Sequence, residues 1–306
     1  APHSPWIGQH PREIVDSYDS CPFKSCPEEP PHPWQIETAP RGTGEERREI
    51  LKGYFAAVTA MDQNVGRILA KLEEEGLTER TLVVFMSDNG MNMGHHGFFG
   101  KGNGTFPLNM YETSVKVPCI VSQPGSVPSG IVEKGMFSQY DIFPTLLDYL
   151  GIGAPRDPKM PGMSFSDLLR GEESAGHGHV VVFDEYGPVR MIKDKDWKYV
   201  HRYPYGPNEL YNVQEDPDEK VNLIDEAKYE KIVWSLRSKL EEFFLRYADP
   251  ERDGAREAVY GMGQIWLAGK ASGGRKSFED TFRYADSQMR FRYRANVPER
   301  HPPKTM

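Results

Sequence analysis

Residues 81–102 read TLVVFMSDNGMNMGHHGFFGKG, and this stretch is more informative about the fold than any other. Its first part, 81–86, is an unbroken run of apolar and β-branched residues, which is typical of a buried strand. Polar residues that follow such a strand lie at the carboxyl edge of a sheet, where open α/β folds bind their ligands. The stretch therefore predicts an α/β fold with a functional loop directly after residue 86.

The loop after this strand carries side chains that suit a metal ion and an oxyanion. Asp88 and Asn89 offer a carboxylate and an amide oxygen, the ligands that Ca²⁺ and Mg²⁺ prefer. His96 and Lys101 add a titratable ring and a fixed positive charge, groups that bind an oxyanion or protonate a leaving group. The alternative is ordinary turn chemistry, because Asn and Gly tolerate positive φ. Two histidines and a lysine in one glycine-rich loop exceed what a turn requires and favour a functional site.

The loop resembles the second signature region of the sulfatases, a family of the alkaline-phosphatase superfamily, in which S-D-N-G precedes G-x-H-G-x-x-x-K. Four further segments resemble sulfatase motifs in the same order: 2–5 (PHSP), 109–118 (NMYETSVKVP), 138–147 (SQYDIFPTLL) and 209–223 (ELYN, then DP, then VNL). The resemblance covers about residues 1–247. It implies an alkaline-phosphatase-like α/β fold, with a mostly parallel sheet flanked by helices and a small C-terminal antiparallel sheet covered by a helix.

The resemblance also implies roles for individual residues. Asp88 and Asn89 would bind a divalent cation, foremost Ca²⁺ with Mg²⁺ as the alternative, and Lys101 would contact the sulfate group. His3 would lie near the leaving-group oxygen, and His96 would line the pocket. Taken alone, Lys101 could equally be a salt-bridged surface lysine and His3 a loop residue beside prolines. The role of the neighbouring histidine at position 95 stays open.

The motif that carries the family's nucleophile is absent from this chain. In sulfatases a cysteine in C-x-P-S-R or C-x-A-S-R is oxidised to formylglycine, close to a pair of metal-binding aspartates. Cys21, Cys26 and Cys119 do not stand in such a motif. The resemblance therefore implies a C-terminal portion of a longer sulfatase-like protein, with formylglycine and the two aspartates expected only in the missing N-terminal portion.

The predicted function is that of a sulfuric ester hydrolase, in which the metal assists attack on sulfur. The substrate would be a sulfate ester of a small molecule or a carbohydrate. One alternative is a phosphonate or phosphate ester hydrolase of the same superfamily. Another is an inactive sulfatase fragment or homologue that only binds or associates, and the missing nucleophile is the reason to consider it.

The pattern of apolar residues and turns predicts three parts. Residues 1–155 are predicted to form the C-terminal part of a sulfatase catalytic core, 156–250 an antiparallel-sheet subdomain with a helix, and 251–306 a basic and aromatic tail. The predicted helices are 43–75, whose apolar stripe should pack on the sheet, 141–150 and 225–247. The predicted strands are 81–86, 117–122, 180–183, 188–192, 197–201 and 209–211.

Composition excludes several classes of protein. The net charge of −8 over 306 residues argues against a general nucleic-acid binder. No run approaches the roughly 18 apolar residues that span a bilayer, so we expect a soluble protein without a membrane span. A secreted, periplasmic or lysosomal-like location is compatible with the sequence, and the oligomeric state is unknown. No glycine-rich nucleotide motif follows a strand, so no nucleotide cofactor is expected.

The segment 269–306 differs from the rest in charge, with nine Lys and Arg against four Asp and Glu. Tyrosines and phenylalanines alternate with these basic residues. The tail could line an anionic-substrate groove, dock on the acidic body or contact another subunit. Docking on the body or simple solvation is favoured, because charge runs usually face water.

Overall fold

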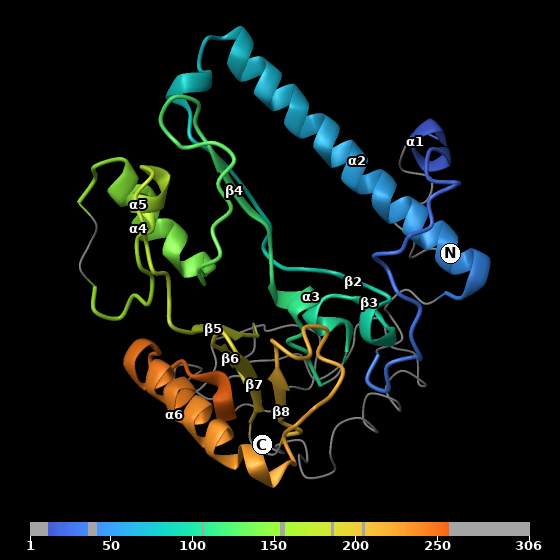
Figure 1. Ribbon diagram of the computed structural model, residues 1–306, viewed down its shortest axis with the longest axis vertical. Helices are drawn as coiled ribbons and strands as arrows, with labels where there is room; N and C mark the ends of the chain where they lie inside the picture. Colours follow the sequence, from blue (N-terminus) through green and yellow to red (C-terminus); the bar gives the residue numbers. More distant parts are fainter. Residues whose placement is uncertain are drawn as a thin grey trace. The chain divides into compact units, whose positions relative to one another are not determined.

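The computed structural model describes residues 12–35, 42–105, 107–153, 157–184, 187–203 and 206–256. The chain divides into two compact units, the first comprising 1–109 and 113–129 and the second comprising 110–112 and 130–306 (Figure 1). His3 and the basic tail from 257 onward lie outside the described residues. The three-part division predicted at residues 155 and 250 stays a prediction.

The first unit contains one long helix and several short elements. The predicted helix 43–75 is observed as α2, and Gly76 ends it with a φ of +64°, which glycine adopts without strain. The elements in chain order are α1 (Arg12–Asp16), α2 (Gly44–Glu74), η1 (Thr78–Arg80), β1 (Val83–Met86), β2 (Asn92–Met93), η2 (His95–Gly97), β3 (Phe99–Gly100), η3 (Gly102–Gly104), α3 (Glu112–Val115) and β4 (Cys119–Ser122). α3 begins at the last residue of the short 110–112 segment that belongs to the second unit.

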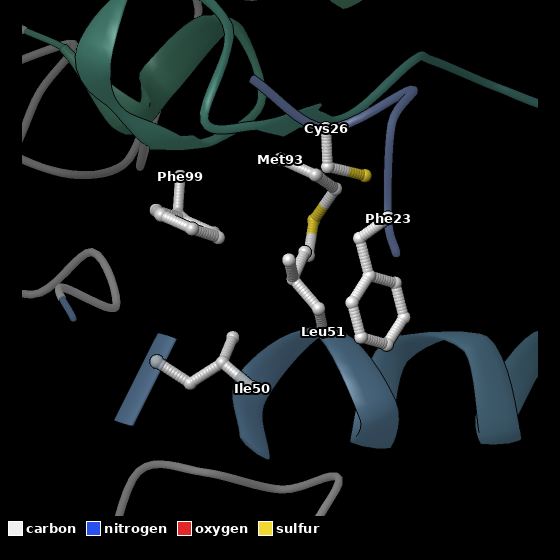
Figure 2. Packing of buried hydrophobic residues seen from close by; sticks show 6 residues of the cluster. All are labelled: Phe23, Cys26, Ile50, Leu51, Met93 and Phe99. Carbon is white, nitrogen blue, oxygen red and sulfur yellow. The ribbon is translucent and has the colours of Figure 1, made fainter. Parts of the chain in front are cut away.

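The core of the first unit is formed by the segment 23–26, the start of α2 and the segment after β1. Its buried side chains are Phe23, Cys26, Ile50, Leu51, Met93 and Phe99 (Figure 2). The last two belong to β2 and β3, which pair antiparallel. Because this hairpin is anchored in the core, the loop that carries the predicted site residues rests on a packed base.

Two expectations for the first unit need correction. β1 and β4 pair antiparallel, with Val83 opposite Ser122, so these two strands do not form the parallel βα pattern that was predicted. Parallel neighbours need a crossover connection that is usually helical, whereas the chain returns from β1 to β4 through the β2–β3 hairpin, turns and short helices. The apolar stripe of α2 is buried only at its start, since Met61 is 46% and Ile68 63% exposed.

The second unit contains the predicted antiparallel sheet with its covering helix. The strands β5 (Val180–Phe183), β6 (Val189–Lys193), β7 (Trp197–Arg202) and β8 (Glu209–Asn212) are ordered β5-β6-β7-β8, and every neighbouring pair is antiparallel. α6 (Glu230–Tyr247), preceded by η5 (Ala227–Tyr229), lies along the sheet in Figure 1. Its Leu236 and Leu240 pack with side chains from all four strands, namely Val181, Ile192, Tyr199 and Leu210. This part of the predicted fold is confirmed.

The remaining helices of the second unit precede the sheet. The predicted helix 141–150 is observed as α4 (Ile142–Tyr149), which follows η4 (Gln139–Asp141), and α5 (Ser166–Leu169) comes next. The fully buried carboxylate of Asp141 accepts hydrogen bonds from the backbone N–H groups of Ser138 and Met163. It also pairs with the ring of His177 at 2.8 Å. η6 (Gly254–Arg256) is the last described element.

Candidate active site

The turn after β1 is built by its own side chains. Asp88 Oδ1 accepts the backbone N–H of Asn89 at 2.8 Å, and the Ser87 hydroxyl donates to the Asn89 carbonyl at 2.8 Å. The Gly90 N–H donates to the Ser114 carbonyl at 2.9 Å. A Cβ atom at Gly90 would lie 2.2 Å from the Thr113 carbonyl oxygen, so only glycine fits. The turn-forming role weighed from the sequence is therefore observed.

This turn brings two of the predicted site residues together. The Lys101 ammonium donates a hydrogen bond to Asn89 Oδ1, with 3.3 Å between the nitrogen and the oxygen. Both Asp88 and Lys101 are exposed, while Asn89 is half-buried. The amide oxygen of Asn89 and the ammonium of Lys101 thus meet at a solvent-accessible edge of the first unit, with Asp88 adjacent to Asn89 in the chain. Their assignment to metal and sulfate binding stays a prediction.

The histidine loop has an unusual backbone that its surroundings impose. Gly94, His96 and Gly97 have positive φ values of 105°, 56° and 74°. A Cβ atom at Gly97 would lie 1.7 Å from the Pro30 carbonyl oxygen. A non-glycine residue with positive φ is uncommon and is tolerated where the surrounding structure enforces it. The loop therefore holds His96 in one conformation, half-buried, and its role as a pocket residue stays a prediction.

One neighbour of this loop was not foreseen from the sequence. The backbone N–H of His32 donates to the Gly97 carbonyl at 3.0 Å, and its ring packs edge-on against the fully buried Phe98 at 5.6 Å between centroids. Its Nδ1 accepts the Trp34 N–H at 3.1 Å. The sequence shows only a proline-rich segment here, and no local pattern indicates which distant loop it covers.

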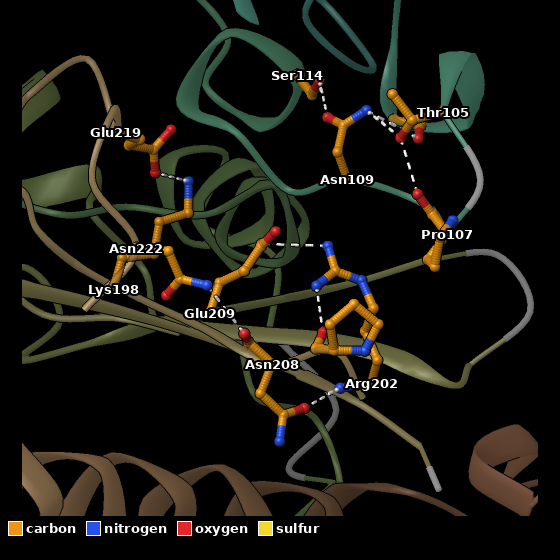
Figure 3. Close-up of polar contacts among 12 residues, drawn as sticks. Thr105, Pro107, Asn109, Ser114, Lys198, Arg202, Asn208, Glu209, Glu219 and Asn222 are labelled. Carbon is orange, nitrogen blue, oxygen red and sulfur yellow. Dashed lines mark hydrogen bonds and ion pairs between the residues drawn. The ribbon is translucent and has the colours of Figure 1, made fainter. Parts of the chain in front are cut away.

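Buried polar side chains form hydrogen bonds with the backbone of the segment that carries Lys101. Asn109, only 1% exposed, donates to the Thr105 hydroxyl and accepts from Ser114 (Figure 3). It also donates to the carbonyls of Lys101 and Gly102. Asn92 is fully buried as well. The sequence offered no reason to assign Asn109 a structural role, although it lies in the motif 109–118. A polar residue next to apolar ones is too weak a pattern to predict a buried hydrogen-bonding asparagine.

The donors suit a divalent cation in kind but are few. Asp88 and Asn89 provide oxygen ligands, and Ca²⁺ takes six to eight of them. In the part of the chain that the structure describes, no group of three or more His, Cys, Asp or Glu could hold a metal ion. Asp88 and Asn89 therefore fit as one side of a metal site whose other ligands would come from elsewhere.

Comparisons with known proteins agree with the motifs. A family model described as "Sulfatase" matches residues 1–152, and one described as "N-sulphoglucosamine sulphohydrolase, C-terminal" matches 94–245. An N-acetylglucosamine-6-O-sulfatase of Bacteroides thetaiotaomicron is 30% identical over 217 residues, which cover 67% of this chain and 38% of that protein. The chain thus spans less than half the length of the curated relatives it matches.

Solved structures show the same likeness. One protein in complex with its substrate D-glucosamine-2-N,6-O-disulfate has a TM-score of 0.61 and 28% identity, covering 70% of this chain and 44% of that chain. A phosphonate monoester hydrolase of Agrobacterium radiobacter has a TM-score of 0.57 and 27% identity, covering 68% and 43%. The first likeness confirms the predicted alkaline-phosphatase-like α/β fold class with its small antiparallel sheet, within which the antiparallel pairing of β1 with β4 is the exception. Among the described helices none is long and apolar enough to cross a membrane.

Proposed function

The chain belongs to the sulfatase family, and from this premise we propose that it contributes half of an active site that hydrolyses sulfate esters of carbohydrates. The observation that carries the proposal is the 3.3 Å contact between the Lys101 ammonium and Asn89 Oδ1, in the turn that also holds Asp88. The sugar as substrate class is supported by the relatives, one of which is an N-acetylglucosamine-6-O-sulfatase.

Lys101 is the group that would bind the sulfate. Its exposed ammonium is fixed near the turn by Asn89 and projects a positive charge at the edge of the unit. A preorganised cation stabilises negative charge that develops on the oxygens of a transferring group, and removing one such donor typically costs about 10²–10³ in kcat. Lys101 would therefore both attract the anionic substrate and lower the barrier to cleavage of the S–O bond.

Asp88 and Asn89 would hold a divalent cation, for which calcium is our proposal. When bound, the cation supplies Lewis-acid polarisation of a sulfate oxygen. The amide oxygen of Asn89 accepts the hydrogen bond of the Lys101 ammonium, which sets the direction in which the carboxamide points, and the same oxygen would be a ligand of the cation. Asn89 would thus contact both positive charges, the cation and the Lys101 ammonium.

The histidines are assigned supporting roles. His96, held by its left-handed backbone, would line the pocket. His3, which lies outside the described residues, would assist departure of the leaving group as a hydrogen-bond donor or acid. For the attacking group we propose formylglycine from sequence other than these 306 residues. Cys26 packs in the core of the first unit at 7% exposure, a position unsuited to attack on a substrate.

The competing function is hydrolysis of phosphonate or phosphate monoesters. The likeness to a phosphonate monoester hydrolase supports it, because the same oxygen ligands and lysine suit either tetrahedral anion. Sulfate monoesters carry one negative charge and phosphate monoesters up to two near neutral pH. Phosphonate monoesters carry one negative charge as well, so the charge of Lys101 separates sulfate from phosphate monoesters but not from phosphonate monoesters.

The test uses the protein encoded with all coding sequence upstream of the Ala1 codon, and the 306-residue chain beside it. We expect the extended protein to hydrolyse a chromogenic aryl sulfate faster than the matching phosphonate, and the 306-residue chain to hydrolyse neither faster than buffer. Lys101→Ala should lower kcat/KM of the extended protein by about 10²–10³. Lys71→Ala, a change on α2 at a side chain 58% exposed, is the matched control and should leave turnover unchanged.

Three outcomes would contradict the proposal. Equal turnover by the parent and by Lys101→Ala would exclude the role of the lysine. A preference for the phosphonate would establish the competing function. Robust turnover by the 306-residue chain, lost on Lys101→Ala, would show that the nucleophile lies within these residues.

A further inference from the structure

Two buried carboxamides lie beneath the segment that carries Lys101. Asn92 is 0% and Asn109 1% exposed, and the hydroxyl of Ser114, itself 3% exposed, joins them. This hydroxyl donates to Asn109 Oδ1 at 2.6 Å and accepts from Asn92 Nδ2 at 2.7 Å. The Asn92 carboxamide oxygen in turn accepts from the hydroxyl of Thr113. We call Asn92, Asn109 and Ser114 the carboxamide network.

The carboxamide network holds three consecutive backbone carbonyls around the lysine. Asn92 Nδ2 donates to the Gly100 carbonyl at 3.0 Å. Asn109 Nδ2 donates to the carbonyls of Lys101 at 3.3 Å and of Gly102 at 3.2 Å, and the Asn109 N–H bonds Gly102 a second time at 3.0 Å. The backbone is therefore fixed before, at and after Lys101 by side chains rather than by a long strand.

The same network reaches the turn that carries the proposed metal ligands. The carbonyl of Ser114 accepts the N–H of Gly90 at 2.9 Å, directly after Asn89 in the chain. Ser114 thus bonds with its hydroxyl toward the lysine segment and with its carbonyl to the turn. Ser114 is therefore bonded directly to the residue after Asn89 and, through Asn92 and Asn109, to the backbone of the segment that carries Lys101.

Such support is needed because the segment cannot fix itself. Lys101 stands between Gly100 and Gly102, residues with few conformational restrictions of their own. Its side chain is exposed, so packing does not lock it, and a free lysine side chain has many rotamers. Buried amides must be hydrogen-bonded, which makes a fully connected network specific for one arrangement of its partners.

We propose that Asn109, together with Asn92 and Ser114, is a positioning residue for Lys101 and sets the distance between its ammonium and the Asn89 turn. The inference rests on the proposed function in one respect, namely that Lys101 binds the sulfate anion. A merely structural network would stabilise the first unit without any specific coupling to the lysine. The two possibilities differ in what happens when Lys101 is already absent.

The experiment measures binding of inorganic sulfate to the 306-residue chain from amide NMR shifts of Gly100 and Gly102. We expect Ser114→Ala and Asn109→Asp each to weaken sulfate binding at least about threefold when Lys101 is present, the size typical of coupled neighbours. Both changes should have no further effect in the Lys101→Ala background. Asn103→Ala, at an exposed residue of the same loop, is the matched control and should leave the binding constant unchanged.

A second measurement, the backbone order parameter of Lys101, needs no ligand and is made on Ser114→Ala, the less disruptive of the two variants. In the parent chain the backbone N–H order parameter of Lys101 should be near about 0.85, and in Ser114→Ala it should fall below about 0.6, while amides of α2 stay rigid. Asn109→Asp places a carboxylate oxygen against two carbonyl oxygens and could unfold the unit, so Ser114→Ala decides the question.

The outcomes distinguish the proposed function of Lys101 from the positioning role of the carboxamide network. If Lys101→Ala binds sulfate as tightly as the parent, the proposed function of Lys101 fails. If Lys101→Ala weakens binding but Ser114→Ala does not, the proposed function stands and the positioning role is wrong. Equal weakening by Ser114→Ala with and without Lys101, or an unchanged order parameter at Lys101, would also overturn the positioning role.

Discussion

The ammonium nitrogen of Lys101 lies 3.3 Å from the carboxamide oxygen of Asn89. The two residues belong to different turns, one after β1 and one after β3, and meet because the short β2–β3 hairpin folds the chain back between them. The hairpin is anchored by Met93 and Phe99 in the core of the first unit. Apolar packing below the loop thus determines a polar contact at its surface.

The close approach of the chain at Gly90 predicts opposite effects for two glycine substitutions. Gly90→Ala would place a methyl group 2.2 Å from the Thr113 carbonyl oxygen, so the turn or the 113–114 segment must shift. Gly66→Ala on α2 meets nothing within 4 Å and should stabilise by about 0.5–1 kcal/mol, because alanine is the better helix former. Chemical denaturation of both variants measures the difference. A Gly90→Ala protein as stable as the parent would contradict the close contact between the turn and the 113–114 segment.

Metal binding by the 306-residue chain is predicted to be weak. Asp88 and Asn89 are two oxygen ligands of the six to eight that Ca²⁺ takes, which leaves affinity no better than roughly the millimolar range. Asp88→Asn removes the only formal charge of this pair and should weaken Ca²⁺ binding further, whereas Asp62→Asn, at an exposed residue of α2, should not. Calorimetric titration with Ca²⁺ is the measurement. Micromolar binding that survives Asp88→Asn would show that the cation is held elsewhere.

The sequence predicted the elements that have a strong local signal. The helix at 43–75 and the strands of the second unit were foreseen because apolar spacing distinguishes a period of 3.6 from a period of 2. The helix predicted at 225–247 is observed as α6, and its Leu236 and Leu240, which stand at helical spacing, are both buried against the sheet. The formation of these helices and strands is determined mainly by residues close to one another in the sequence.

Features that depend on distant partners were missed. The antiparallel pairing of β1 with β4 is decided by which strands meet in space, and no pattern within 83–86 or 119–122 encodes it. Asn89 and Lys101 were named from a motif, but the support from Asn92 and Asn109 was not foreseen. The sequence does not distinguish a buried asparagine from an asparagine in an exposed turn, because the difference lies in the hydrogen-bond partners that the fold brings to it.

The buried ring of His201 predicts that stability falls at mildly acidic pH. Burial lowers its pKa to about 4, with Arg237 acting in the same direction, whereas the unfolded value is about 6.5. Between these values the unfolded chain binds a proton that the folded chain does not, so the unfolding free energy decreases as pH falls from about 6.5 to 4. The total decrease in the free energy of unfolding is on the order of 3 kcal/mol. His201→Gln should flatten this part of the curve in urea titrations at several pH values, and an unchanged slope would refute the assignment.

The last prediction concerns a lysine buried between two carboxylates in the second unit. Lys198 is 0% exposed, and its ammonium lies 2.6 Å from Glu219 Oε1 and 3.1 Å from Glu112 Oε1. Burial raises the pKa of Glu219, opposed by the charge of Lys198. At Glu112 burial acts in the same upward direction, but the ammonium groups of Lys198 and Lys193 outweigh it and lower the pKa.

Removing the Lys198 ammonium should therefore lower the free energy of unfolding far more than removing that of an exposed lysine. Lys198→Met leaves the carboxylate of Glu219, on a residue 3% exposed, without its ammonium partner, and loss of one member of a buried pair typically costs about 3–5 kcal/mol. Lys195→Met, at a side chain 83% exposed, should change the unfolding free energy by less than about 1 kcal/mol. The double change Lys198→Met with Glu219→Gln should recover part of the loss, because it also removes the stranded charge. Equal stability of the two single variants in urea denaturation would show that the buried pair contributes nothing.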